Sequence, residues 1–146
     1  MTEIRRITSE DAILVRWPIL RSGLPRESAA FDGDEDSATV HLGGFHANRL
    51  AGVASIYRAT FPPQPDLKET WQLRGMATLP EVRGLGLGRA LLEACEQTAR
   101  TSGGSLLWCN ARVHAATFYA RHGWQQVGDE FDIPTVGPHI RMFRLL

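Results

Sequence analysis

Three glycines alternate with leucines in the segment RGLGLGR, which spans residues 83–89. The stretch before it, Trp71–Thr78, alternates as a β-strand does, and an amphipathic helix is predicted to follow over residues 86–102. Because glycine has no β-carbon, such a turn lets backbone N–H groups converge and lets a ligand come close to the main chain. The chain is therefore predicted to contain a strand–turn–helix unit with an anion-binding turn at the helix N-terminus.

Arginines flank this turn on both sides and add full positive charges, so a phosphate or diphosphate is the expected ligand. A P-loop would end in Gly-Lys-Ser/Thr, whereas Gly88 is followed here by Arg89 and Ala90. A dinucleotide-binding fingerprint needs G-x-G-x-x-G, and Gly88 follows Gly86 one position too early for it. A glycine-rich loop that only turns the chain is the remaining alternative.

The hydrophobic pattern of the remaining sequence predicts an alternation of strands and helices. A capping box formed by Thr8 and Asp11 is predicted to start a helix that runs to about Arg21, and Trp17-Pro18 is expected to bend it or end it early. The other predicted helix is short and spans 111–122. Strands are predicted over Glu3–Ile7, Ala38–Phe45, Leu50–Arg58, Trp71–Thr78, Leu106–Cys109, Trp124–Val127 and Ile140–Leu145.

This order of elements predicts a mixed sheet. Strand–helix–strand connections imply that part of the sheet is parallel. The hairpin with the turn His46-Ala47-Asn48-Arg49 adds antiparallel strands. The fold class is α/β by sequence order, or α+β by some definitions, with helices that cover the sheet. A chain of 146 residues is expected to form a single domain, 1–146.

Composition excludes several classes of function. Sixteen basic and sixteen acidic residues give no net charge, so nucleic-acid binding is not expected. No apolar run approaches the ~18 residues of a membrane span, and the charged N-terminus does not resemble a secretory signal. The two cysteines, Cys95 and Cys109, are too few for a disulfide framework or a four-thiolate metal site. A reduced, cytoplasmic setting without a metal is expected.

Two blocks of the sequence resemble the GNAT superfamily of acyl-CoA-dependent N-acyltransferases: GMATLPEVRGLGLGRALLEACEQTA and ARVHAATFYARHGWQQVG. The family signature Arg/Gln-x-x-Gly-x-Gly/Ala is matched by Arg83, Gly86 and Gly88. A second block, Phe-Tyr-x-x-x-Gly-aromatic, is matched by residues 118–124. The resemblance implies a mostly antiparallel sheet whose two central parallel strands splay apart around the cofactor, with helices on both faces.

The resemblance also implies roles for individual residues. Acetyl-CoA is the expected cosubstrate, and Tyr119 matches the tyrosine that commonly faces the coenzyme sulfur. Many members have an asparagine seven residues before this tyrosine, where this chain has Arg112, and Asn110 is the nearest substitute. The residues expected to bind the cofactor are Met76, Ala77, Thr78, Arg83, Gly84, Leu85, Gly86, Leu87, Gly88, Arg89, Asn110 and Tyr119.

Amine acetylation also needs a base, because a lysine-like amine costs about 4.6 kcal/mol to deprotonate at pH 7. Glu69, just before the cofactor strand, and His139, at a loop-to-strand junction, are the two candidates. The alternative interpretation of Glu69 is a solvated carboxylate, and that of His139 is a partly exposed structural histidine. His114 and His122 are expected at the surface, Glu130 and Asp132 either shape an acceptor pocket or face solvent, and a buried Cys109 is expected to be inert.

The predicted function is transfer of an acetyl group from acetyl-CoA to a primary amine of a small molecule or peptide, by direct attack through a tetrahedral intermediate. A catalytically silent acyl-CoA-binding or sensing module is the alternative, and an unrelated nucleotide-binding domain is a third interpretation. The acidic stretch Asp32–Asp36 either attracts a cationic amine or is a solvated loop. Dimerisation through sheet edges or C-terminal strands is open.

Overall fold

The computed structural model describes residues 2–146. They form two compact units. The first comprises the chain up to Tyr57 together with Leu73–Thr98, and the second comprises Arg58–Gln72 together with Ala99–Leu146. Strand β4 (Thr70–Thr78) and helix α2 (Leu87–Thr101) each contribute residues to both units.

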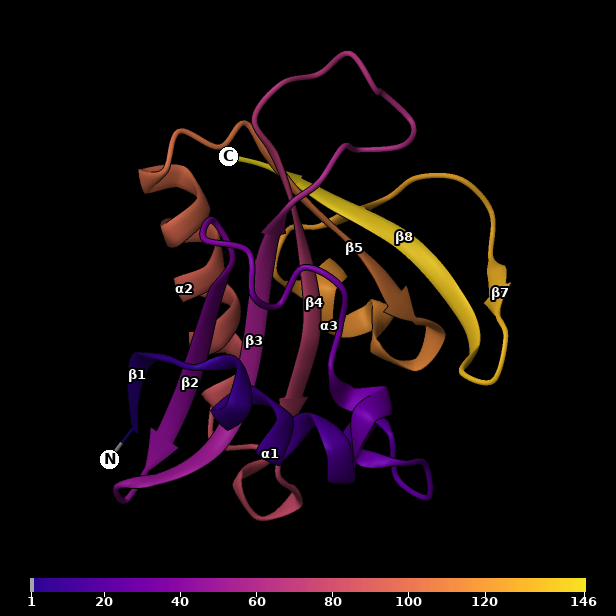
Figure 1. The fold of residues 1–146 in the computed structure, drawn as a ribbon. Coiled ribbons are helices and arrows are strands. Elements are labelled where there is room, and N and C mark those ends of the chain that lie inside the picture. The colour runs from indigo at the N-terminus through magenta and orange to yellow at the C-terminus, as the bar shows by residue number, and fades with distance from the viewer. Residues whose placement is uncertain (1) are drawn as a thin grey trace. The chain divides into compact units, whose positions relative to one another are not determined.

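In the first unit, strands lie in the order β1-β2-β3-β4. β1 (Thr2–Ile7) and β2 (Val40–His46) pair antiparallel, as do β2 and β3 (Arg49–Arg58). The β2–β3 turn has Ala47 and Asn48 at φ 49° and 65°, the left-handed conformations of a two-residue hairpin turn. The predicted hairpin is therefore confirmed (Figure 1).

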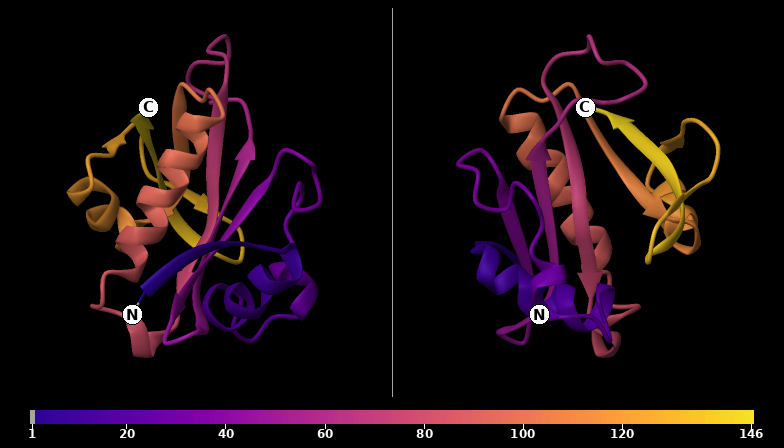
Figure 2. Two further views of the ribbon diagram at one scale, coloured as in Figure 1. Left: turned by 90° about the vertical axis from the view of Figure 1, so that its left-hand side faces the viewer. Right: turned by 45° about the vertical axis from the view of Figure 1, so that its right-hand side comes forward.

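Helices α1 (Ser9–Leu20) and α2 cover opposite faces of these strands. A β-carbon at Gly52 would lie 2.9 Å from a methyl group of Leu91 in α2. The next residue, Val53, packs against Val15 of α1 in a buried cluster. Because successive strand residues point to opposite faces, the two helices lie on the two sides of β3, as the left view of Figure 2 shows. The expected helices on both faces are confirmed for this unit.

The capping box at the start of α1 and the predicted end near Arg21 are confirmed, whereas an early end at Trp17-Pro18 is wrong. Thr8 Oγ1 accepts the Asp11 N–H at 3.1 Å, and the Asp11 carboxylate accepts the Thr8 N–H at 3.4 Å. Pro18 lies inside the helix, which continues to Leu20. A proline removes one N–H donor, but the next turn still forms, because the Arg21 N–H donates to the Trp17 carbonyl at 3.1 Å.

Two short 3₁₀ helices complete the first unit: η1 (Arg26–Ala29), which follows α1, and η2 (Pro80–Val82), which follows β4. Within β4, Gly75 has a φ of +69°, in the left-handed region. A β-carbon there would lie 2.7 Å from Nε of Arg16. Glycine is required at this position both for the backbone conformation and for the close approach of Arg16.

In the second unit, the first residues of β4 pair in parallel with β5 (Leu106–Arg112), from Thr70 opposite Leu106 to Gln72 opposite Trp108. β5 pairs antiparallel with β8 (Gly137–Leu145), which also pairs antiparallel with β6 (Gln125–Gln126) and β7 (Phe131–Ile133). The second unit thus contains the parallel pair of β4 and β5 together with antiparallel pairs, and the first unit contains antiparallel pairs. This confirms the mixed, mostly antiparallel α/β class.

Two predictions for the second unit are wrong in detail. The predicted helix 111–122 is a 3₁₀ turn, η3 (Val113–Ala115), followed by α3 (Ala116–Arg121), because residues 111 and 112 continue β5. Strand β7 was not predicted, because its three residues are held as a strand by pairing with β8. The core of this unit contains Phe61, Leu106 and Trp108, against which Phe143 and Leu67 pack.

Candidate active site

The glycine-rich turn leads directly into α2. Gly84 and Gly86 have φ of +84° and +83°, and a β-carbon at either would meet no atom within 4 Å. The backbone conformation, and not crowding, therefore requires glycine there. The Ala90 N–H donates to the Gly86 carbonyl at 3.0 Å, which begins the helical ladder. The N–H groups of residues 87–89 precede it and have no intrahelical acceptor.

The two arginines that flank the turn have different surroundings. The Arg83 side chain donates to the Thr78 carbonyl at 3.2 Å and so ties the turn to the end of β4. Arg89 forms an exposed ion pair with Glu93, one helical turn away, at 2.7 Å. The turn is solvent-exposed from Arg83 to Gly86, with Leu85 53% exposed. Free amides, glycines and a helix N-terminus together make a cradle that suits an anionic group.

The end of β4 carries the residues expected to contact the acyl arm. Ala77 is buried, whereas Met76 and Thr78 are half-buried. The Leu79 N–H donates to the Ala51 carbonyl of β3 at 2.8 Å, so the strand is held by its neighbour past its last residue. The structure brings this segment and the turn together through the bond from Arg83 to Thr78.

In the second unit, one face of the β5–β8 ladder carries a polar group of four residues. Asn110 lies opposite Arg141, and Arg112 lies opposite His139, in a register that continues without interruption from Leu106 opposite Leu145. Directly opposite residues of an antiparallel pair share a face. Asn110, Arg112, His139 and Arg141 are therefore neighbours on one face, which we name the β5–β8 polar face.

The geometry of His139 fixes its tautomer. Its ring is 4% exposed, and Nδ1 lies 2.7 Å from the Gly137 carbonyl oxygen. A carbonyl can only accept a hydrogen bond, so Nδ1 carries the proton and the lone pair of a neutral ring lies on Nε2. The ring packs beside Phe131 of β7, with a centroid distance of 6.0 Å. The unpredicted strand β7 thus helps to hold the predicted histidine.

Tyr119 lies on the other side of the same ladder. It is buried, its ring packs on Trp124 at 5.2 Å, and its hydroxyl is hydrogen-bonded to the Cys109 thiol. Cys109 alternates with Asn110 along β5, so Tyr119 contacts the face opposite the β5–β8 polar face. Burial raises the pKa of the Cys109 thiol, which keeps it protonated at neutral pH. This agrees with an inert Cys109.

Asn110 and Glu69 are each engaged with an arginine. The Asn110 Oδ1 accepts from Arg141 Nε at 3.3 Å, so its side chain lies on the face away from Tyr119. Glu69 is half exposed and forms an ion pair with Arg58 at 3.0 Å. Of the other acids and histidines considered, His114, Glu130 and Asp132 are exposed, and His122 is half-buried beside Phe118.

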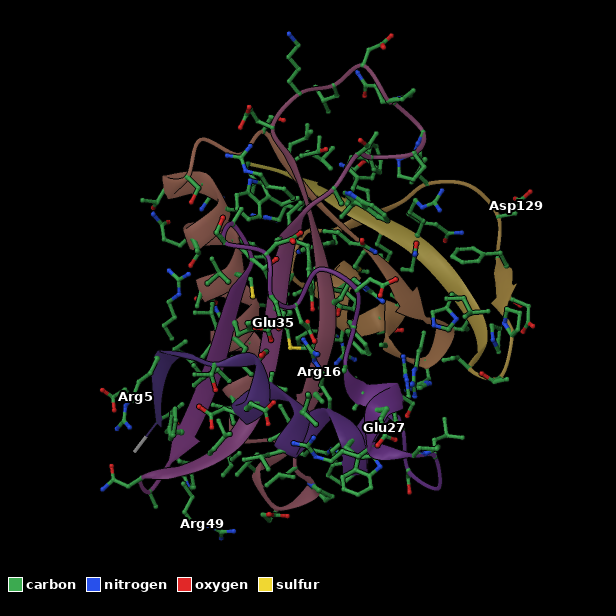
Figure 3. All side chains as sticks on the ribbon, viewed as in Figure 1. Arg5, Arg16, Glu27, Glu35, Arg49 and Asp129 are labelled. Atoms are coloured by element: carbon green, nitrogen blue, oxygen red, sulfur yellow. The ribbon has the colours of Figure 1, made fainter. Side chains whose placement is uncertain are left out.

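Sequence reasoning missed a buried polar network in the first unit. Arg16 is fully buried, pairs with Asp34 at 2.7 Å and donates to Ser55 and Tyr57. Figure 3 shows Arg16 in the interior and Arg5 and Arg49 at the periphery. Burial alone would raise the pKa of Asp34, but hydrogen bonds from Arg16, Tyr57 and the Phe31 N–H hold it below its usual value. The acidic stretch Asp32–Asp36 is thus partly structural.

Two further guanidinium groups, of Arg21 and Arg74, stack near the Phe31 ring at 5.1 and 4.6 Å from its centroid. A hollow of about 320 Å³ is lined by α1 residues and by the loop 30–36. Within residues 2–146, no three His, Cys, Asp or Glu side chains group as metal ligands would. No helix in this part of the chain has the length and apolar character needed to cross a membrane.

Comparison with known proteins identifies the family. The profile of the Acetyltransferase (GNAT) domain matches residues 26–141. The chain belongs to the GNAT acetyltransferase family. It is 38% identical over 150 residues to the uncharacterized N-acetyltransferase YitI of Bacillus subtilis (strain 168), in an alignment that covers all of this chain and 97% of the relative. Members of this family are acyltransferases, so the chain is an acyltransferase enzyme.

Solved structures share the fold at low sequence identity. A putative N-acetyltransferase from Lactobacillus plantarum superposes with a TM-score of 0.81 at 17% identity, over 99% of this chain and 98% of the other. An aminoglycoside 6′-N-acetyltransferase complexed with coenzyme A superposes with a TM-score of 0.75 at 14% identity, over 98% and 96%. The fold is therefore that of GNAT acetyltransferases.

Proposed function

We propose that the protein is an N-acetyltransferase that moves an acetyl group from acetyl-CoA to a primary amine of a small molecule or peptide. The observation that carries this proposal is the exposed N-terminus of α2, where two glycines at positive φ and three amides without intrahelical acceptors form an anion cradle. We further propose that residues 1–146 act as one catalytic domain, and that it works in the cytoplasm, since Cys95 and Cys109 are both free thiols.

In this proposal the turn holds the diphosphate of coenzyme A. Backbone amides of Gly84 and of residues 86–89 donate to the phosphate oxygens, whereas the Leu85 N–H already donates to the Val82 carbonyl at 3.2 Å. Arg83 adds positive charge while it stays tied to Thr78. The Met76–Thr78 segment aligns the acyl arm, and a backbone N–H of Ala77 or Thr78 stabilises the oxyanion. Acetyl-CoA supplies a thioester carbonyl and a thiolate leaving group. Asn110 is retained as a weaker candidate contact, because Arg141 already occupies its Oδ1.

We propose His139 as the general base in preference to Glu69. The amine must lose a proton before it attacks, and Nε2 of His139 has its lone pair available because Nδ1 donates to Gly137. Glu69 is held in an ion pair with Arg58 and is half exposed. Nε2 takes one proton from the ammonium group, the neutral amine then attacks the acyl carbon, and a tetrahedral intermediate forms.

We propose Tyr119 as the group that stabilises the departing sulfur. When the C–S bond breaks, the thiolate accepts a hydrogen bond and then the proton of the Tyr119 hydroxyl. A thiol has a pKa near 8.5 and leaves readily, whereas a phenol near 10 is a weaker acid, so the proton moves late. The Cys109 thiol contacts the same hydroxyl and is a polar neighbour that keeps it oriented. The acylated nitrogen loses its remaining extra proton through solvent, which restores the Tyr119 hydroxyl, and the proton on His139 is released to solvent.

A catalytically silent acyl-CoA-binding module is not favoured, because a named N-acetyltransferase relative aligns over the whole chain. The test is release of free thiol from acetyl-CoA by the purified protein, with and without each member of a panel of amines. The proposal expects amine-dependent release and an N-acetylated product identified by mass spectrometry. Acetyl-CoA binding without release for any amine would instead support the silent module.

A further inference from the structure

Arg141 occupies a defined place on the β5–β8 polar face. It lies on β8 opposite Asn110 and two residues from His139, and both side chains point to the same face. Strand residues rise about 3.4 Å each, so Arg141 and His139 begin about 7 Å apart along β8. One small molecule is therefore long enough to place one group at Arg141 and another at the proposed base.

The guanidinium of Arg141 has few partners in the protein. Its Nε donates to Asn110 Oδ1 at 3.3 Å, and its Cζ lies 5.6 Å from the ring centroids of both Trp108 and Phe131. Within residues 2–146, no carboxylate lies within 4.0 Å of it. The aromatic faces stabilise the cation in part, but they leave its two terminal nitrogens without an acceptor.

Those terminal nitrogens are open to a ligand. Within residues 2–146, the side-chain nitrogens that are both buried and without a hydrogen-bond partner belong to four other residues. The terminal nitrogens of Arg141 have no partner in this part of the chain and are not among these buried atoms, so they are accessible to solvent. The flanking groups on this face, Asn110, Arg112 and His139, carry no negative charge at neutral pH. Asp132 of β7 pairs with Pro138 and alternates with Phe131, so its carboxylate points to the other face.

We infer that Arg141 is a specificity-determining residue that binds an anionic group, a carboxylate or phosphonate, on the amine acceptor while His139 removes the amine proton. This inference rests on the proposed function. A planar guanidinium with two free terminal nitrogens matches two carboxylate or phosphonate oxygens at once. The preferred acceptors are thus amines that also carry an acid, and their neutral analogues lose the contact.

The experiment compares glycine, 3-aminopropanoate and 4-aminobutanoate with their carboxamides, and adds 2-aminoethylphosphonate. Thiol release from acetyl-CoA is measured for the wild type, Arg141→Gln, Arg141→Lys and the control Arg121→Gln. Arg121 is exposed on α3 and loses the same charge. We expect at least one acid to exceed its carboxamide about tenfold to a hundredfold in kcat/KM. Arg141→Gln removes that preference, Arg141→Lys keeps part of it, and Arg121→Gln leaves it intact.

A second measurement separates this inference from the proposed function. Calorimetry records binding of the same acids and carboxamides to the full chain in the presence of coenzyme A, which has no acetyl group to transfer. Acid-selective binding that is lost in Arg141→Gln supports the inference, whether or not thiol is released. Absence of thiol release would refute only the acetyltransferase proposal. Turnover or binding without preference for any acid, or a preference that survives Arg141→Gln, overturns the inference.

Discussion

Replacement of Gly86 by alanine tests whether the turn before α2 binds coenzyme A. At φ +83° an L-residue is disfavoured by about 1–2 kcal/mol, and alanine regains about 0.4–1 kcal/mol by restricting the unfolded chain. The net cost in folding free energy is therefore about 1 kcal/mol, with no steric term, since a β-carbon there meets no atom within 4 Å. The variant is expected to fold.

The expected effect on the ligand is larger than the effect on stability. If the backbone at residue 86 relaxes, the amides of the turn no longer converge, and each charge-assisted hydrogen bond lost costs about 1.5–3 kcal/mol. Affinity for acetyl-CoA is therefore expected to fall about tenfold to a hundredfold per lost bond. Titration calorimetry measures this, and urea denaturation measures the folding free energy of the same samples.

Gly103 provides a matched control. It follows the C-terminal end of α2, has φ +82°, and likewise has no atom within 4 Å of a β-carbon. Gly103→Ala should lose the same stability as Gly86→Ala and keep its affinity for acetyl-CoA. A wild-type affinity in Gly86→Ala would refute the assignment of the turn, and an equal loss of affinity in both variants would show that the effect arises from global destabilisation.

Three further predictions concern the proposed chemistry and the buried network. His139→Gln is expected to lower kcat/KM about a hundredfold or more, whereas the exposed His114→Gln keeps the wild-type kcat/KM; an unchanged kcat/KM in His139→Gln would exclude this base. Tyr119→Phe is expected to lower kcat about a hundredfold with little change in acetyl-CoA affinity, and an unchanged kcat in stopped assays of thiol release would remove its assigned role. Arg16→Met is expected to cost about 3–5 kcal/mol of folding free energy in urea denaturation, because it leaves the Asp34 carboxylate buried without its cation. Because the pKa of Asp34 is lowered in the folded state, the stability that its charged carboxylate contributes is present above the unfolded pKa of about 3.9 and is lost as pH falls below that value. Asp34→Asn should therefore flatten the dependence of folding free energy on pH in this acidic range. An unchanged acid dependence in Asp34→Asn would contradict the network.

Local features of the sequence were the most predictable. The capping box at Thr8, the hairpin turn at Ala47 and Asn48, and the start of α2 after Gly86 depend on residues within a few positions of each other. The same locality explains why the glycine turn and the two family blocks are recognisable in the amino-acid sequence alone. Pro18 was misjudged because a proline near a helix end removes a bond that the helix can lose without stopping.

Features that depend on distant residues were not predictable. Arg16 has the character of a surface residue in an amphipathic helix, and its burial requires Asp34, Ser55 and Tyr57, which lie up to 41 positions away. Strand β7 needs β8 beside it, and the polar face needs the register that sets Arg112 opposite His139. Arg141 alternates with apolar residues in a predicted strand, and only the register with Asn110 makes it a candidate for acceptor binding.

The most direct measurement of the central claim is a crystal structure of the protein with coenzyme A. We expect the two phosphoryl groups of the diphosphate at the N-terminus of α2, with their oxygens about 2.7–3.2 Å from backbone nitrogens of Gly84 or of residues 86–89. A diphosphate bound at any other part of the chain, with these amides facing solvent, would contradict the account.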